Sequence, residues 1–294
     1  MTGPATGPVI VGVDGGASST DALTLAGWAA RTLEAPLVVA AVHPAPSAIG
    51  SGRVDAEWIS DRRGAAERAL DQARTLAGPA DYRVIASSSA AHGLHDLAEQ
   101  LAATLIVVGS AAAAPKARTF AGSTAERLLA GSVCPVAVAP TGMPSPPGEL
   151  GRIGVAYVDT PDGRAALATA ARLAARTRTP LRLITVVARG DAARPFLLGT
   201  DAERAFLDTA RESYEEALRR ASESVADIPV EWELRSGDVV ESLADLDDVD
   251  VLFCGSRGYG PTRRVLLGGV SARLVRRARR PIVVVPRAGS AAIV

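Results

Sequence analysis

The chain has 294 residues, enough for about two domains, and 48% of them are hydrophobic, which is ample for two cores. Its 32 basic residues balance 32 acidic ones, so we expect no general affinity for nucleic acid or for an anionic membrane. No run approaches the roughly eighteen apolar residues of a spanning helix, and the N-terminus lacks the pattern of a signal peptide. We therefore expect a cytoplasmic protein.

The first predicted strand covers residues 9–14, a near-continuous apolar run of the kind that a parallel sheet covered on both faces requires. Its counterpart covers residues 153–159. The runs end in Asp14 and Asp159, at the rim where open α/β sheets bind ligands. Either carboxylate could bond to an adenine or ribose edge, or could cap the following turn or helix. Spacing alone leaves both interpretations open.

Apolar spacing predicts helices over 18–33 and 161–176, and second strands over 37–42 and 181–187 that follow Pro36 and Pro180. The distance from Asp to Pro is 22 residues in the first copy and 21 in the second, which predicts a one-residue deletion in the second. Long amphipathic helices are predicted over 55–76 and 200–225, third strands over 82–86 and 230–234, and short helices near 94–101 and 239–246.

A glycine-rich stretch over 251–271 combines a strand pattern, a loop with arginines and a helix start. Glycine lets a backbone approach a phosphate closely, and a helix start directs N–H groups and the positive end of its dipole into the same space. The same layout also occurs as a plain tight connection in α/β folds, so the pattern needs further support.

That support is an internal repeat. Positions displaced by 146 residues match without a gap from the Gly109 loop to Pro140: Gly255 corresponds to Gly109, and Gly268 to Gly122. Each copy ends in an apolar strand flanked by prolines, over 135–140 and 281–286, as expected for edge strands. An apolar edge associates with others unless it is covered.

Gly-x-x-Gly, nine residues, Gly-(Ser/Thr) and a proline-flanked strand resemble the nucleotide-binding signature of the universal stress protein family. The whole chain resembles two such domains in tandem, over 1–140 and 152–294, with a linker at 141–151. The resemblance implies an α/β fold: two open, parallel, five-stranded, Rossmann-like sheets with helices on both faces. It also implies that the fifth strands of the two halves pair within the chain. Further pairing into a homodimer stays open.

In the ATP-binding branch of that family, the glycine loop and the Asp hold the nucleotide, and the end of the second strand lines the adenine pocket. The resemblance therefore implies ATP, with or without Mg²⁺, as the ligand of this chain. In the first copy the matching residues are Asp14, Gly15, Val42, Gly109, Ala112, Gly122, Ser123, Thr124 and Ala125. In the second copy they are Asp159, Val186, Gly255, Arg257, Gly258, Gly268, Gly269, Val270 and Ser271.

Both copies depart from the signature. Ala112 replaces the second glycine of the first copy, at a cost of about 1–2 kcal/mol if that position demands positive φ, and Glu126 would repel a phosphate. The second copy keeps Gly258 and adds Arg257, but has Gly269 in place of the hydroxyl residue. We expect both pockets to accept adenine nucleotide and the second to bind it more tightly.

The sequence has no paired carboxylates of defined spacing, no nucleophile elbow and no P-loop. No further Cys or His completes a ligand set with His92 and His95, so we expect no metal site there. We expect an ATP-binding stress-response regulator or sensor with, at most, slow ATP hydrolysis. One alternative is a nucleotide-free dimerisation or scaffold protein. Another is an ATP-dependent enzyme that uses residues 14–19, which partly resemble the loop of pyrophosphate-releasing ATP enzymes.

Overall fold

The computed structural model describes residues 6–45, 56–112, 114–143, 149–188, 200–256 and 268–286. In the first half the elements are β1 (Val9–Gly12), α1 (Ala17–Leu33), β2 (Leu37–Pro44), α2 (Ala56–Ala77), β3 (Asp81–Ser87), α3 (Ala90–Gln100), β4 (Leu105–Gly109), α4 (Ser123–Gly131) and β5 (Val136–Ala139). In the second half they are β6 (Ile153–Ala156), α5 (Pro161–Thr177), β7 (Leu181–Ala188), α6 (Thr200–Glu223), β8 (Val230–Gly237), α7 (Val239–Ala244), β9 (Val251–Gly255), α8 (Gly269–Leu274) and β10 (Ile282–Val285).

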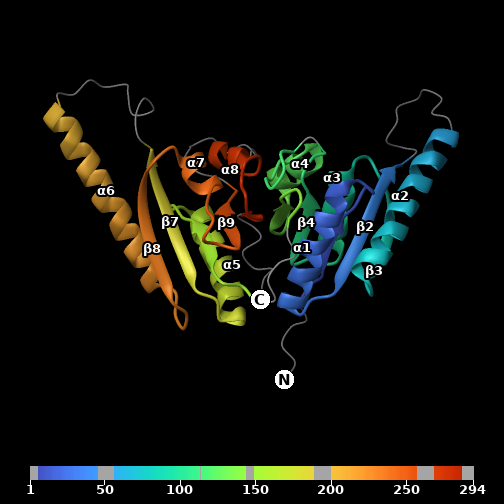
Figure 1. Ribbon diagram of the computed structural model, residues 1–294, viewed down its shortest axis with the longest axis horizontal. Helices are drawn as coiled ribbons and strands as arrows, with labels where there is room; N and C mark the ends of the chain where they lie inside the picture. Colours follow the sequence, from blue (N-terminus) through green and yellow to red (C-terminus); the bar gives the residue numbers. More distant parts are fainter. Residues whose placement is uncertain are drawn as a thin grey trace.

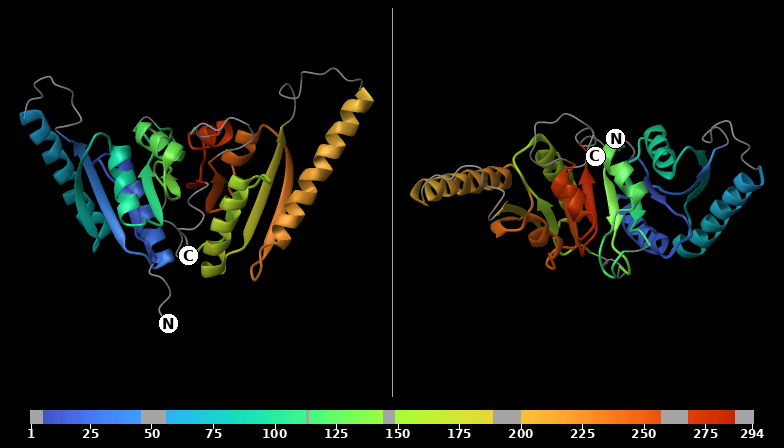
Figure 2. Two further views of the ribbon diagram at one scale, coloured as in Figure 1. Left: turned by 180° about the vertical axis from the view of Figure 1, so that it is seen from behind. Right: turned by 90° about the horizontal axis from the view of Figure 1, so that it is seen from above.

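The ten strands form one sheet in the order β3-β2-β1-β4-β5-β10-β9-β6-β7-β8. Neighbouring strands within each half are parallel, so the predicted pair of five-stranded parallel sheets is confirmed. The halves stand side by side as similar lobes, with α2 and α6 at the outer ends (Figures 1 and 2).

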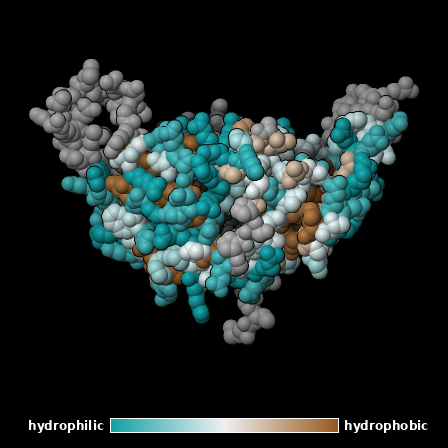
Figure 3. Space-filling view, viewed as in Figure 1, coloured by the Kyte–Doolittle hydropathy of each residue, from teal (hydrophilic) through white to brown (hydrophobic). Residues whose placement is uncertain are grey.

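Helices cover both faces of this sheet and form two apolar layers. One layer packs α1, α2, α5 and α6 against side chains such as Val11 and Val155. The other packs α3, α4, α7 and α8 against side chains such as Ile106 and Leu252. On the face seen in Figure 3, hydrophilic residues dominate and hydrophobic ones show in smaller areas among them, as expected where amphipathic helices cover a sheet. Among the described residues, no helix is both long enough and apolar enough to cross a membrane.

The two halves meet at an antiparallel pair of strands, β5 and β10. Val136 lies opposite Val284, Ala137 opposite Val283, and Val138 opposite Ile282. The side chains of these six residues are buried. Each proline-flanked edge is therefore covered by the other, as the sequence predicts, and the partner strand lies in the same chain.

Strand register corrects one expectation from the sequence. Equal numbers of residues separate Val9 from its partner Leu37 and Ile153 from its partner Leu181. The N–H of Val13 donates to Ala40, and the N–H of Tyr157 donates to Ile184 at the equivalent place. The copies therefore align without a gap here, and the predicted deletion is wrong. The residue equivalent to Asp14 is Val158, and Asp159 lies one position further on.

Candidate functional site

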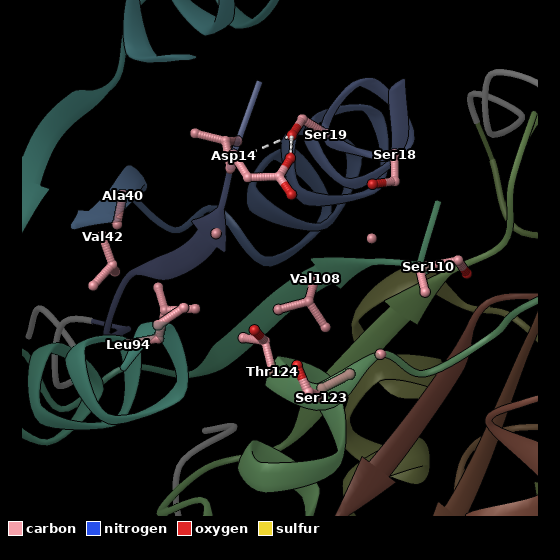
Figure 4. Close-up of a pocket in the computed structure, with 17 residues that line it drawn as sticks. Asp14, Ser18, Ser19, Ala40, Val42, Leu94, Val108, Ser110, Ser123 and Thr124 are labelled. Carbon is pink, nitrogen blue, oxygen red and sulfur yellow. Dashed lines mark hydrogen bonds between the residues drawn. The ribbon is translucent and has the colours of Figure 1, made fainter. Parts of the chain in front are cut away.

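A cavity of about 310 Å³ opens at the carboxyl ends of β1, β2 and β4 in the first half. Figure 4 shows Asp14 and Ser19 on one side of it and Ser123 and Thr124 on the opposite side. Its lining consists of Gly12, Val13, Asp14, Ser18, Ser19, Ala40, Val42, Ala90, Leu94, Val108, Gly109, Ser110, Ala111, Gly122, Ser123, Thr124 and Ala125. Seven of the nine residues predicted for the first copy lie in this lining; Gly15 and Ala112 do not.

The carboxylate of Asp14 is held in place by its own turn. Its Oδ1 accepts hydrogen bonds from the N–H of Gly16 and from the hydroxyl of Ser19, each at 2.9 Å. The Ser19 hydroxyl in turn accepts the N–H of Asp14 at 3.1 Å. Gly15 provides the positive φ of this turn, 81°. Both roles considered for Asp14 are therefore compatible, because Oδ1 stabilises the turn while Oδ2, which takes no part in these bonds, stays at the cavity.

Apolar side chains form a wall beside Asp14. Ala40, Val42, Leu94 and Val108 line it, from β2, α3 and β4 (Figure 4). Ala40 accepts the N–H of Val13 from β1, and alternate residues of a parallel strand bond to opposite neighbours. Val42 therefore directs its N–H and C=O toward the same side as Ala40, beyond the end of β1. A flat ring against this wall would meet one backbone donor and one backbone acceptor.

The opposite side of the cavity is the start of α4. Its N-cap residue, Gly122, makes no side-chain cap bond, so the helix leaves the N–H groups of Ser123, Thr124 and Ala125 without an intrahelical partner. Gly109 lies close by at the end of β4, where a Cβ would come within 2.4 Å of the Ser18 carbonyl oxygen. Only glycine allows β4 and α1 to approach this closely.

The loop between β4 and α4 rests on the second half. The N–H of Thr119 donates to Ala278, and the N–H of Ala121 donates to Val275, at 2.7 and 2.8 Å. Ser110 fixes the near end of the loop, because its hydroxyl donates to Ala139 and accepts the N–H of Phe120. The first cavity is therefore shaped by contacts from both halves.

Two weaknesses that the sequence predicts, one in this loop and one in the first turn of α4, take a different form in the structure. Ala112 is described and does not have positive φ, so the anticipated strain is absent. Glu126 forms an ion pair with Arg276 of the second half, which offsets its negative charge near α4. Glu126, which the sequence marks as unfavourable for phosphate binding, therefore contributes to a contact between the two halves.

The second half has a cavity of about 260 Å³ at the corresponding place. Its lining consists of Ala156, Tyr157, Val158, Thr160, Gly163, Ile184, Val186, Val239, Leu243, Cys254, Gly255, Gly269, Val270, Ser271, Arg273 and Leu274. Of the residues predicted for the second copy, Val186, Gly255, Gly269, Val270 and Ser271 lie here. Gly268 precedes them as the N-cap of α8, and Arg257 and Gly258 lie outside the described residues.

Asp159 lies outside the lining of the second cavity. Its Oδ1 accepts hydrogen bonds from Arg164 at 2.5 Å and from the Tyr157 hydroxyl at 3.3 Å. It borders a groove between α5 and α6 instead. The structure does not support the adenine contact expected for Asp159, because strand register places Val158 at the cavity instead.

The family model described as the universal stress protein family matches residues 6–140 and 149–286. This chain belongs to the universal stress protein family. Curated universal stress proteins of Mycobacterium tuberculosis and Mycobacterium bovis are each 32% identical over 292 residues, spanning 95% of this chain and 99% of the relative. The resemblance noted in the sequence is thus confirmed over both copies.

Solved structures of universal stress proteins share the tandem fold. One from Archaeoglobus fulgidus is 19% identical, with a TM-score of 0.64, and covers 96% of this chain and 97% of its own. A putative universal stress protein from Pseudomonas aeruginosa is 16% identical, with a TM-score of 0.65, and covers 96% and 94%. At identities this low, the similarity shows a shared fold.

Sequence reasoning missed several residues of the first cavity in this universal stress protein. Ser19 has a sequence signal, because it lies within residues 14–19, which partly resemble the loop of pyrophosphate-releasing ATP enzymes. Ala40 also had a signal, since it lies two residues before Val42 on a predicted strand. Leu94 had none, because only the packing of α3 over the sheet brings it to the cavity.

Both thiols of this universal stress protein are buried. Burial raises the pKa of Cys134 to about 11 and that of Cys254 to about 12. The thiolate is the reactive form, so at pH 8 we expect neither thiol to react appreciably with iodoacetamide in the folded chain. Both react after denaturation, as mass spectrometry of the labelled peptides will reveal. Rapid labelling of Cys254 in the folded chain would contradict this prediction.

Proposed function

We propose that this universal stress protein binds ATP, with or without Mg²⁺, in the first cavity and acts as a stress-response regulator or sensor through nucleotide-dependent conformation. One observation carries the proposal: a fixed carboxylate, Asp14, and an uncapped helix start, at Ser123, face the same cavity from opposite sides. The family membership of the chain supports it.

The apolar wall suits the adenine ring. Ala40, Val42, Leu94 and Val108 offer a flat-ring ligand apolar contact, and a base needs in addition a few placed polar groups for orientation. The N–H and C=O of Val42 supply one donor and one acceptor, which is the pattern of an adenine edge. In our proposal this pair selects adenine.

The polar groups suit the sugar and the phosphates. The free oxygen of Asp14 accepts hydrogen bonds from ribose hydroxyls. The N–H groups at the start of α4 face a negatively charged phosphate, and the helix dipole favours that charge. Asp14 is the one formally charged side chain in the described lining, so in our proposal positioning groups for rapid phosphoryl transfer are scarce and hydrolysis is slow.

We further propose that the first cavity is the tighter nucleotide site, which reverses the ranking expected from the sequence. The second cavity has Val158 in place of Asp14 and Ile184 in place of Ala40, so it offers less polar contact and less room for a base. We also propose a cytoplasmic location, because both described cysteines are free thiols, as a reducing compartment favours.

Titration calorimetry with ATP and Mg²⁺ tests this function, and we expect one ATP per chain. Mass spectrometry of small molecules released by denaturing the fresh protein will give about one adenine nucleotide per chain if it co-purifies. Two ATP per chain with equal affinity would contradict the ranking. No heat at millimolar ATP and no released nucleotide would refute the proposal and favour the scaffold alternative.

A further inference from the structure

The second cavity has the position and backbone of the first but a different chemical character. Strand register places Val158 at the position of Asp14, Gly163 at that of Ser19 and Ile184 at that of Ala40. The repeat places Val270 at the position of Thr124. Each of these four changes removes a polar group or adds an apolar one. Ser271, at the position of Ala125, adds a hydroxyl, but that hydroxyl donates to the Gly255 carbonyl oxygen.

The lining of the second cavity is mainly aliphatic. Ile184, Val186, Val239, Leu243, Val270 and Leu274 contribute to it. Tyr157 and Cys254 also line it, and burial raises the pKa of each to about 12, so both are neutral near pH 7. The hydroxyls of Thr160 and Ser271 in this lining already form hydrogen bonds with the backbone of Gly163 and Gly255. A polar nucleotide would therefore find few partners for its hydroxyls here, and unpaired buried polar groups are costly.

The backbone of the second half leaves no room for a serine at Gly163, the position equivalent to Ser19. A Cβ at Gly163 would lie 1.9 Å from the carbonyl oxygen of Val158, so no side chain fits there. The hydrogen bond that holds Asp14 in the first half therefore has no counterpart in the second. Restoring a carboxylate at Val158 alone would not rebuild the first site.

Among the described residues that line the second cavity, one carries a full charge, and that charge is positive. Arg273 is exposed at the rim, where its Nε donates to the Gly269 carbonyl oxygen at 3.2 Å. No carboxylate belongs to the described lining. Asp238, which caps α7, lies outside it; its pKa is lowered mainly by the N–H of Glu241, with a smaller contribution from Arg273.

We infer that the second cavity binds a small apolar molecule with a single anionic group, such as a medium-chain carboxylate. The aliphatic lining holds the hydrocarbon part, and Arg273 attracts the anionic group at the rim. A cavity of about 260 Å³ suits a ligand smaller than a drug-sized molecule. The chain then responds to two unlike metabolites through two related sites.

Calorimetry of the full chain with octanoate tests this inference, and we expect one octanoate per chain. Hexanoate binds roughly fifteenfold more weakly, because each buried methylene contributes about fourfold in affinity. Octanol, which lacks the charge, binds more weakly than octanoate. Saturating ATP does not displace octanoate, since the two ligands occupy different cavities.

Paired variants locate the ligand. Val270→Trp fills the second cavity, and we expect it to weaken octanoate binding at least tenfold, whereas Thr124→Trp at the equivalent place in the first cavity leaves octanoate binding unchanged. Arg273→Gln weakens octanoate but not octanol, and Arg127→Gln, the repeat-equivalent arginine outside the first cavity, affects neither. An unchanged melting temperature of Val270→Trp shows that the variant is folded.

Three results would overturn the inference. They are no octanoate binding at millimolar concentration, octanoate binding that Val270→Trp leaves intact, and displacement of octanoate by ATP. Equal affinity for octanol and octanoate would mean that the ligand needs no anionic group, which would contradict the role given to Arg273. Because octanoate binding and its loss in Val270→Trp are both measured without ATP, failure of the ATP proposal and failure of this inference are distinguishable.

Discussion

Replacing Ser123 by Glu is expected to weaken ATP binding by roughly 30-fold, which corresponds to about 2 kcal/mol. Ser123 is exposed at the first position of α4, so the new carboxylate lies where the proposal places the phosphates. The helix itself tolerates the change, because a negative charge in the first turn is favourable. Titration calorimetry measures the affinity, and the melting temperature verifies the fold.

Gly269→Glu is the matched control in the second half. Gly269 begins α8 at the equivalent position, and a Cβ there would meet no atom within 4 Å. We expect this variant to bind ATP as the parent chain does. A larger loss of ATP affinity from Gly269→Glu than from Ser123→Glu would restore the ranking that favours the second pocket. Unchanged ATP affinity in both variants would mean that the phosphates of ATP bind at neither helix start.

Val284→Asp is expected to lower the melting temperature by at least about 6 °C. Val284 is 2% exposed and lies opposite Val136 at the junction of the halves, so the substitution buries a charge without a partner. Such a charge costs about 3 kcal/mol or more, and each kcal/mol corresponds to roughly 2–4 °C in a domain of this size. Scanning calorimetry measures the change.

Val84→Asp makes the same chemical change on an outer strand. Val84 is 37% exposed on β3, at the end of the sheet, where the new carboxylate stays in water. We expect a change within about 0.5 kcal/mol. Equal effects of the two substitutions would mean that the β5–β10 junction contributes little to stability.

The fold could be predicted because its signals are local or repeated. Apolar runs, proline-flanked last strands and two copies of one glycine loop specify a tandem parallel sheet, and the covered edge of β5 follows from its apolar character. The structure adds that the two sheets are joined into one, with both apolar layers running through both halves.

The errors at the site arose where alignment depends on contacts in space. The sequence pattern pairs Asp159 with Asp14 because both follow an apolar run, yet only strand register identifies Val158 as the equivalent residue. In the sequence Glu126 has no visible partner, because Arg276, with which it forms an ion pair, is distant along the chain. The backbone of Ala112 likewise follows from a loop that rests on the other half, which no local pattern reveals.

That loop depends on carbonyl groups supplied by Val275 and Ala278, which belong to the other half of the same polypeptide. A support shared between separate molecules would be lost on dilution, because its occupancy would follow mass action. Within one chain the support is present at a fixed ratio of one to one, whatever the concentration. A cell with few copies of this protein therefore holds the same fraction of completed sites as a cell with many.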